Sequence, residues 1–170
     1  MPELIPLISQ QEIEEKIQET GQKITQDYKG LDLVVIGVLK GAFVFLADLV
    51  RQITIDLEID LVGASSYQNT SSTGQIVFTK QPDLELKGRD ILLVEDIVDT
   101  GRTITKTVES MQLLNPRSIK ICALIDKKER RETQINVDYS CFCLDGFIVG
   151  YGLDYNEKYR NLPAIFELKF

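Results

Sequence analysis

Hydrophobic and polar positions repeat with two different periods along this chain, and each period predicts one type of element. Ser9 followed by Glu12 is a capping-box pattern, which marks the first turn of a helix. The apolar positions that follow share one helical face, and Gly30 is suited to end the helix. That face consists of Ile13, Ile17, Ile24 and Tyr28.

Short apolar runs alternate with helical segments through the rest of the chain. Strands are expected at residues 33–38, 57–64, 75–79, 91–95 and 118–125, and helices at 42–51 and 103–114. The tail, residues 147–170, mixes a short strand with turns. This alternation predicts an α/β fold with a largely parallel sheet, whose ligands bind beyond the carboxyl ends of the strands. Because no repeat or linker interrupts the chain, residues 1–170 indicate a single domain.

The charge balance narrows the classes of partner and of chemistry. The chain carries 19 basic and 26 acidic residues, a net charge of -7, and it contains no histidine. An acidic protein is poorly suited to a nucleic-acid backbone, although a few local cations still suffice for a small anionic substrate. Without histidine, acid–base chemistry falls to carboxylates, lysine or tyrosine, and a metal should be an oxygen-liganded ion such as Mg²⁺.

Three cysteines, Cys122, Cys141 and Cys143, show no disulfide spacing and indicate reduced thiols in a cytoplasmic protein. Cys141 and Cys143 occupy alternate positions of an apolar stretch, so both are expected to be buried on a strand. The N-terminal residues lack a basic region followed by a long apolar core, and no apolar run approaches about 18 residues. Neither a signal peptide nor a membrane span is therefore expected.

The segment ILLVEDIVDTGRT, residues 91–103, carries the densest candidate chemistry. An apolar strand delivers Glu95 and Asp96 to its carboxyl end, and Asp99 follows closely. Residues 100–103 then lead into a helix, and small residues before a helix form a nest of backbone N–H groups suited to phosphate. Anion donors beside three acids require a cation or sugar hydroxyls between them. A phosphorylated sugar with Mg²⁺ satisfies both demands.

Two other interpretations of this acidic segment remain open on the residues alone. The acids are also what a helix start favours through the macrodipole. A receiver domain likewise places paired acids after such a strand, but near the beginning of the domain, whereas Glu95 and Asp96 lie past the middle of this chain.

The stretch VEDIVDTGRT is similar to the phosphoribosyl pyrophosphate signature of type I phosphoribosyltransferases, and further matches extend over residues 38–163. The resemblance implies the fold of that family: a largely parallel central sheet flanked by helices, a small purine-binding hood and a flexible catalytic loop. It implies that Glu95 and Asp96 hold the ribose hydroxyls, partly through Mg²⁺, and that Asp99 acts as general base or acid beside the imidazole edge of a purine. The cradle of the 5-phosphate would be Thr100, Gly101, Arg102 and Thr103.

Two further strand ends acquire roles from the same resemblance. Lys40 and Gly41, which alone would indicate a surface turn, correspond to the pyrophosphate loop, where the peptide bond between Leu39 and Lys40 is often cis. Ser66 and Tyr67 correspond to catalytic residues that close over the site at the start of a polar loop. Gln68 stands where the family usually has glycine.

The last strand end contributes Lys127, which alone would indicate a solvated ion pair with neighbouring acids. By resemblance Lys127 is catalytic and donates to the 6-oxo group of the base, and Arg131 lies near the pyrophosphate side.

Residues 147–163, FIVGYGLDYNEKYRNLP, look like the purine-binding end of the hypoxanthine-guanine subfamily. By resemblance Phe147 stacks on the base and the backbone of Ile148 reads its 6-oxo edge. Asp154 binds a second Mg²⁺, and Arg160 holds pyrophosphate. Taken alone, Phe147 would be an ordinary core residue and Arg160 a cation on a helix face.

The function implied is transfer of a 5-phosphoribosyl group from phosphoribosyl pyrophosphate to hypoxanthine or guanine, giving IMP or GMP and pyrophosphate in purine salvage. Mg²⁺ is the implied cofactor and a homodimer or homotetramer the implied assembly, with no nucleic-acid or membrane partner. Two alternatives stay open: a relative that prefers xanthine, and a regulator that uses this fold to sense a ligand and bind RNA or DNA. The net charge of -7 disfavours the regulator.

Overall fold

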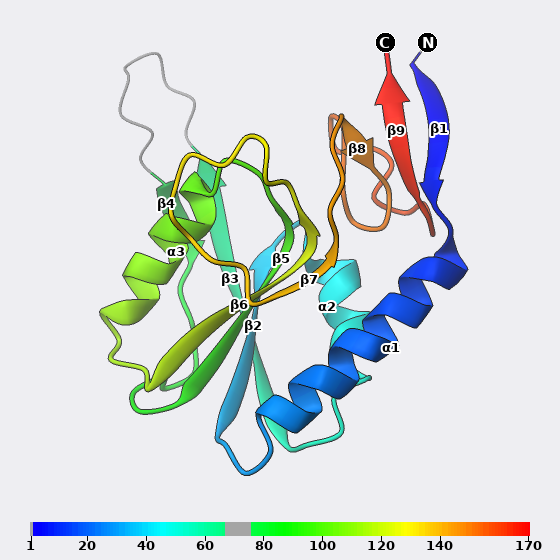
Figure 1. Cartoon of the computed structure of the whole chain (residues 1–170). Helices are drawn as coiled ribbons and strands as arrows, with labels where there is room; N and C mark the ends of the chain where they lie inside the picture. Colours follow the sequence, from blue (N-terminus) through cyan, green and yellow to red (C-terminus); the bar gives the residue numbers. More distant parts are fainter. Residues whose placement is uncertain (1, 67–75) are drawn as a thin grey trace.

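The computed structural model describes residues 2–66 and 76–170 (Figure 1). A six-stranded sheet has the order β4-β3-β2-β5-β6-β7, and every neighbouring pair is parallel except β3 with β4. The bounds of these strands are β2 Leu33–Leu39, β3 Leu57–Ser66, β4 Ile76–Lys80, β5 Asp90–Val98, β6 Ser118–Asp126 and β7 Tyr139–Phe142. The predicted α/β architecture with a largely parallel sheet is confirmed.

Three helices cover the sheet on its two faces. Helices α1 (Gln10–Asp27) and α2 (Phe43–Val50) pack on one face, and α3 (Arg102–Gln112) packs on the other (Figure 1). Strand β2, LVVIGVL, is apolar almost throughout because alternate side chains enter the two cores. Leu33 and Val35 face α1 and α2, while Val34 and Ile36 face α3.

Helix α1 follows its sequence pattern closely. The side chain of Ser9 accepts from the amide of Glu12, and the carboxylate of Glu12 accepts from the amide of Ser9, so the capping box is confirmed. The four predicted face residues are all buried: Ile13, Ile17, Ile24 and Tyr28.

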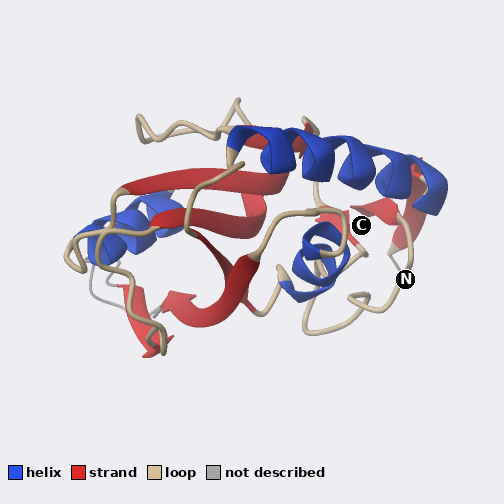
Figure 2. Ribbon diagram, turned by 90° about the horizontal axis from the view of Figure 1, so that it is seen from below, coloured by secondary structure: helices blue, strands red, loops and turns tan. Residues whose placement is uncertain are grey.

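A second, antiparallel sheet of order β1-β9-β8 forms the hood over one end of the molecule. Its strands are β1 (Glu3–Ile8), β8 (Ile148–Val149) and β9 (Ile165–Lys169). Strand β1 was not predicted, because the short segment contains Pro6 and is held only by pairing with β9. This pairing brings the two chain termini close together (Figures 1 and 2). The apolar side chains of the hood join the core on the α1 and α2 side of the sheet.

The strand pairing opens a crevice at the carboxyl ends of the central strands. Strand β2 pairs with β5 only as far as Gly37 and Val94, whereas β5 continues to pair with β6 as far as Val98 and Asp126. From this central pair the chain builds outward in both directions, to β3 on one side and to β6 on the other. Such a switch point is where ligands bind in open parallel sheets.

Two expectations about individual residues need correction. Strand β5 extends to Val98 rather than ending at Glu95, so Asp96 also lies within the strand, because β6 keeps pairing with this part of the chain. Cys141 is buried on β7 as expected, but Cys143 is exposed because β7 ends before it and the chain leaves the sheet. Among the described residues, no helix is long and apolar enough to cross a membrane.

Candidate active site

Two adjoining pockets occupy the crevice at the carboxyl ends of β5 and β6. The larger has a volume of about 500 Å³ and lies between these strand ends and the hood. The smaller, of about 260 Å³, lies over the loop that leads from β5 into α3. Both are lined by Asp96, Ile97 and Asp99, so the acidic end of β5 forms their common wall.

The smaller pocket contains the predicted phosphate loop. Gly101 has φ 84° and immediately precedes α3, and a Cβ at this position would lie 2.2 Å from Oγ1 of Thr133. Only glycine therefore fits the turn that aims the first amides of α3 at the pocket. Thr100 and Thr103 line the pocket, whereas the guanidinium of Arg102 is exposed and forms an ion pair with Glu132. Arg102 thus contributes its backbone, and not its guanidinium, to the phosphate loop.

Of the paired acids of β5, Glu95 is buried and Asp96 is half-buried, and Asp96 lines both pockets. Burial, followed by the neighbouring Asp96 carboxylate, raises the pKa of Glu95 well above its usual value. Burial also raises the pKa of Asp96, to about 6, although the amide of Ile97 donates to its carboxylate at 2.7 Å. Asp154 raises the pKa of Asp96 further and Arg160 lowers it. A cation bound here would therefore favour the ionised form of both acids.

The predicted pyrophosphate loop lies directly against Asp96. The peptide bond between Leu39 and Lys40 is cis, which confirms the expectation from the resemblance. A Cβ on Gly41 would lie 1.7 Å from Oδ2 of Asp96, and a Cβ on Gly152 would lie 2.4 Å from the carbonyl oxygen of Gly41. Two glycines thus allow the ends of β2 and β5 and the hood to meet around one carboxylate.

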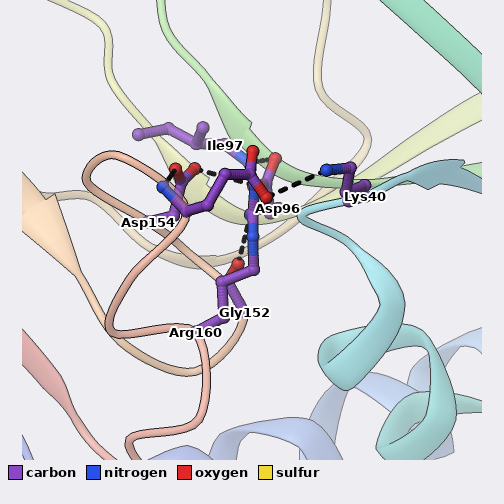
Figure 3. Close-up of polar contacts among 7 residues, drawn as sticks. Lys40, Asp96, Ile97, Gly152, Asp154 and Arg160 are labelled. Atoms are coloured by element: carbon purple, nitrogen blue, oxygen red, sulfur yellow. Dashed lines mark hydrogen bonds and ion pairs between the residues drawn. The ribbon is translucent and has the colours of Figure 1, made fainter.

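The two cations assigned to pyrophosphate converge on this point from different parts of the chain (Figure 3). Arg160 donates to the carbonyl oxygen of Gly152 at 2.7 Å and forms ion pairs with Asp154 at 3.0 Å and Glu157 at 3.3 Å. Lys40 forms an ion pair with the same Glu157 at 2.9 Å. The sequence interpretation missed Glu157, because nothing local indicates that the carboxylate links two cations from opposite ends of the chain.

The larger pocket brings the predicted purine-binding residues together. Lys127 is 7% exposed, and its ammonium donates to the carbonyl oxygen of Gly146 at 2.6 Å. Asp99 faces the same pocket with one oxygen 3.1 Å from Arg130. Within the described residues its other oxygen, Oδ1, is buried and accepts no hydrogen bond. The pocket therefore presents one buried donor and one unsatisfied acceptor.

The hood supplies the apolar wall of this pocket. Phe147 is half-exposed and Ile148 is buried, and both line the pocket beside Asp154. The ring of Phe147 meets Tyr155 edge-to-face with the two centroids 5.6 Å apart, and an edge contact with Phe170 adds to this. The exposed part of Phe147 is thus held at the mouth of the pocket, available to a planar ligand.

Arg131 does not lie where the resemblance placed it. The guanidinium of Arg131, which the resemblance set near pyrophosphate, is turned inward between the ends of β5 and β6 and pairs with Asp126. Ser66 is the last residue of β3, and Tyr67 lies outside the described residues.

Comparison with known proteins agrees with this geometry. Residues 7–156 match the model of the phosphoribosyl transferase domain family. The chain is 43% identical over 163 residues to the hypoxanthine phosphoribosyltransferase of Escherichia coli (strain K12), covering 94% of this chain and 92% of that one. It is 46% identical over 165 residues to the hypoxanthine-guanine phosphoribosyltransferase of Bacillus subtilis (strain 168), covering 96% and 92%.

Solved structures give the same result. A hypoxanthine-guanine phosphoribosyltransferase from Bacillus anthracis superposes with a TM-score of 0.91 at 40% identity, covering 99% of both chains. A hypoxanthine phosphoribosyltransferase from Staphylococcus aureus gives 0.92 at 40% identity, covering 96% of this chain and 90% of that one. The chain therefore belongs to the phosphoribosyltransferase family, has its type I fold and falls in the hypoxanthine-guanine branch.

Proposed function

We propose that this protein transfers the 5-phosphoribosyl group from 5-phosphoribosyl 1-pyrophosphate to hypoxanthine or guanine, yielding IMP or GMP and pyrophosphate. The observation that carries the proposal is that one pocket beside a phosphate loop contains both the buried ammonium of Lys127 and a buried carboxylate oxygen of Asp99 that accepts no hydrogen bond within the described residues. A 6-oxopurine with an exchangeable ring proton satisfies both groups.

Base recognition follows from the donor and acceptor capacities of the side chains. An ammonium donates and never accepts, so Lys127 suits the 6-oxo group of hypoxanthine or guanine. The 6-amino group of adenine presents donors, so it would face the ammonium of Lys127 with a donor in place of an acceptor. Phe147 stacks on the base, and the backbone of Ile148 contacts its 6-oxo edge.

Asp99 is the general base of the forward reaction. Its free oxygen accepts a proton from the imidazole ring of the base, which raises the nucleophilicity of the ring nitrogen that attacks the anomeric carbon. The bond from this carbon to the pyrophosphate oxygen breaks, and the electron pair leaves with pyrophosphate. In the reverse direction the protonated Asp99 returns the proton to the base.

The remaining site residues bind the sugar and the leaving group. Backbone amides of residues 100–103, with the hydroxyls of Thr100 and Thr103, bind the 5-phosphate. Glu95 and Asp96 hold the ribose hydroxyls. The cis peptide and Gly41 present amides to pyrophosphate, whose charge Lys40 and Arg160 offset. These two cations exchange their contacts with Glu157 and Asp154 for the phosphate oxygens.

The donor set fits Mg²⁺ as cofactor. Glu95, Asp96 and Asp154 offer only oxygen ligands, and a cation would help to ionise the first two, whose pKa values are raised by burial. In the part of the chain that the structure describes, no three metal-binding side chains form a cluster. These carboxylates would hold Mg²⁺ together with oxygens of the substrate, and the ion would supply charge compensation for the leaving group.

Three parts of the proposal rest on the family resemblance alone. Ser66 and Tyr67 close over the bound substrates and exclude water from the reacting carbon. The subunits associate as a homodimer or homotetramer, and the enzyme is cytoplasmic.

The base-specificity prediction compares the wild type with Lys127→Met. In steady-state assays the wild type should use hypoxanthine and guanine and almost no adenine, since leaving a buried donor without its acceptor costs about 1–3 kcal/mol, and more for a charged group. Lys127→Met should lower kcat/KM for the 6-oxopurines by about 10- to 100-fold and narrow the gap to adenine, because a hydrogen bond to a charged group is lost.

Lys128→Met is the matched control, because Lys128 is adjacent but exposed, and its rates should match those of the wild type. Equal rates with adenine and hypoxanthine in the wild type would refute the assigned pocket. A preference for xanthine would show that the substrate is xanthine rather than hypoxanthine or guanine.

Asp99→Asn should lower kcat by about 10²- to 10⁴-fold with every accepted base, because it removes proton transfer. Discrimination against adenine should persist, since Lys127 is unchanged. The surface variant Asp56→Asn removes the same charge at the opposite ends of the strands and should keep the wild-type kcat. Retention of full turnover by Asp99→Asn would show that another group accepts the proton.

Removal of divalent cations tests the cofactor. Turnover with hypoxanthine should disappear in excess chelator and return when Mg²⁺ is added in excess over the chelator, because the leaving group requires charge compensation. Circular dichroism should be unchanged by the chelator, which separates loss of catalysis from unfolding. Undiminished turnover in metal-free buffer would contradict the metal assignment.

A further inference from the structure

Arg131 holds a position between the two strand ends that carry the chemistry. It lies in the connection from β6 to β7, and its side chain is only 15% exposed. Its guanidinium is surrounded by acceptors: one carboxylate, that of Asp126, and four backbone carbonyl oxygens. All three guanidinium nitrogens donate within the fold.

These acceptors belong to both strand ends. On the β5 side, Nε donates to the carbonyl oxygen of Asp99 at 3.1 Å and Nη2 to that of Val98 at 3.3 Å. On the β6 side, Nη2 donates to the carbonyl oxygen of Lys127 at 3.2 Å and to the carboxylate of Asp126. One planar group thus touches the backbone of both Asp99 and Lys127.

The contact lies where the sheet no longer provides this connection. The ladder between β5 and β6 ends with the pair Val98 and Asp126, and the amide of Lys127 then donates to Val98 at 2.9 Å. Asp99 is one residue beyond this ladder. The guanidinium of Arg131 therefore connects the two strands one residue further, at Asp99, the residue to which the proposed function assigns proton transfer.

The same side chain supports the phosphate loop. A Cβ on Gly101 would lie 2.9 Å from Cδ of Arg131, so the two are in close contact. The segment after Arg131 also reaches the loop, because the amide of Glu132 donates to the carbonyl oxygen of Thr100 at 2.9 Å. A displacement of Arg131 would consequently disturb Asp99 from two directions.

We infer that Arg131 is a positioning residue: its guanidinium fork sets the distance between the carboxylate of Asp99 and the ammonium of Lys127, and so aligns the base for attack. This inference rests on the proposed function, which assigns proton transfer to Asp99 and base recognition to Lys127. The fork is essential because the bond to the carbonyl oxygen of Asp99 is made by Nε, while Nη2 makes the bonds to Val98 and Lys127. A lysine has a methylene in place of Nε, so its single ammonium would lose the contact with Asp99.

A simpler role would be stability alone, through the buried ion pair of Arg131 with Asp126. Two substitutions separate the roles. Arg131→Lys keeps a cation opposite Asp126 but loses the fork. Asp126→Asn removes the ion pair but leaves the bonds from Arg131 to the carbonyl oxygens. If the fork positions the site, the first variant loses catalysis and the second loses stability.

The experiment measures kcat and KM with hypoxanthine, per mole of folded protein, alongside thermal unfolding. Arg131→Lys should lower kcat by about 10- to 100-fold, the scale of a misplacement of about 1 Å, while KM for hypoxanthine changes by less than about threefold. Asp126→Asn should lower Tm but keep kcat within about threefold of the wild type. The double variant Asp126→Asn/Arg131→Gln leaves no unpaired buried ion and should show the same fall in kcat as Arg131→Lys.

Arg117→Lys is the matched control, because Arg117 pairs with Asp90 and joins β5 to β6 at their opposite ends. Its kcat should equal that of the wild type. A wild-type kcat in folded Arg131→Lys, or an equal fall in kcat in Asp126→Asn, would overturn the inference while leaving the proposed function intact. Absence of phosphoribosyl transfer by the wild type would instead overturn the proposed function.

Discussion

The divergence of β2 from β5 at their carboxyl ends is the constraint on which the site depends. Pairing between them stops at Gly37 and Val94, while β5 stays paired with β6 for several more residues. The resulting crevice admits three loops from distant parts of the chain: the loop after β2 that contains Gly41, the loop between β5 and α3, and the loop of the hood that contains Gly152. They approach one another closely only because Gly41 carries no side chain beside Asp96 and Gly152 carries none beside the carbonyl oxygen of Gly41. A larger residue at either position would force the loops apart.

Charge within this crevice is arranged for a ligand that brings the missing partners. Glu95 is buried and Asp96 half-buried, burial raises the pKa of both, and within the described part of the chain Asp99 keeps one buried oxygen without a donor. By contrast, the ion pair of Lys40 with Glu157 is exposed on both sides, and exposed pairs contribute little free energy. A polyanion such as pyrophosphate can therefore displace Glu157 at low cost. The buried contacts between the strand ends hold the framework of the site, and the weak, exposed ion pair of Lys40 with Glu157 lies where the substrate must enter.

Local pattern predicted the elements whose stability is largely local or whose burial is complete. The capping box of Ser9, the apolar run of β2 and the glycine turn before α3 all carry short-range signals that the structure confirms. The resemblance added the cis peptide before Lys40. The misses depend on contacts between distant residues: β1 exists because β9 pairs with it, and Cys143 is exposed because β7 is short. The inward turn of Arg131 likewise depends on carbonyl oxygens from another strand, which no sequence pattern displays.

The central claim is that Lys127, a buried donor, selects a 6-oxo group. Equilibrium binding of the two nucleotides IMP and AMP, measured by isothermal titration calorimetry, tests it without the complications of turnover. The nucleotides share the ribose and the 5-phosphate, so contacts with the phosphate loop and with Glu95 and Asp96 cancel in the comparison. IMP should bind at least about 100-fold more tightly, since AMP presents the ammonium with a 6-amino donor in place of the 6-oxo acceptor. Equal affinities for IMP and AMP, or tighter binding of AMP, would contradict the account.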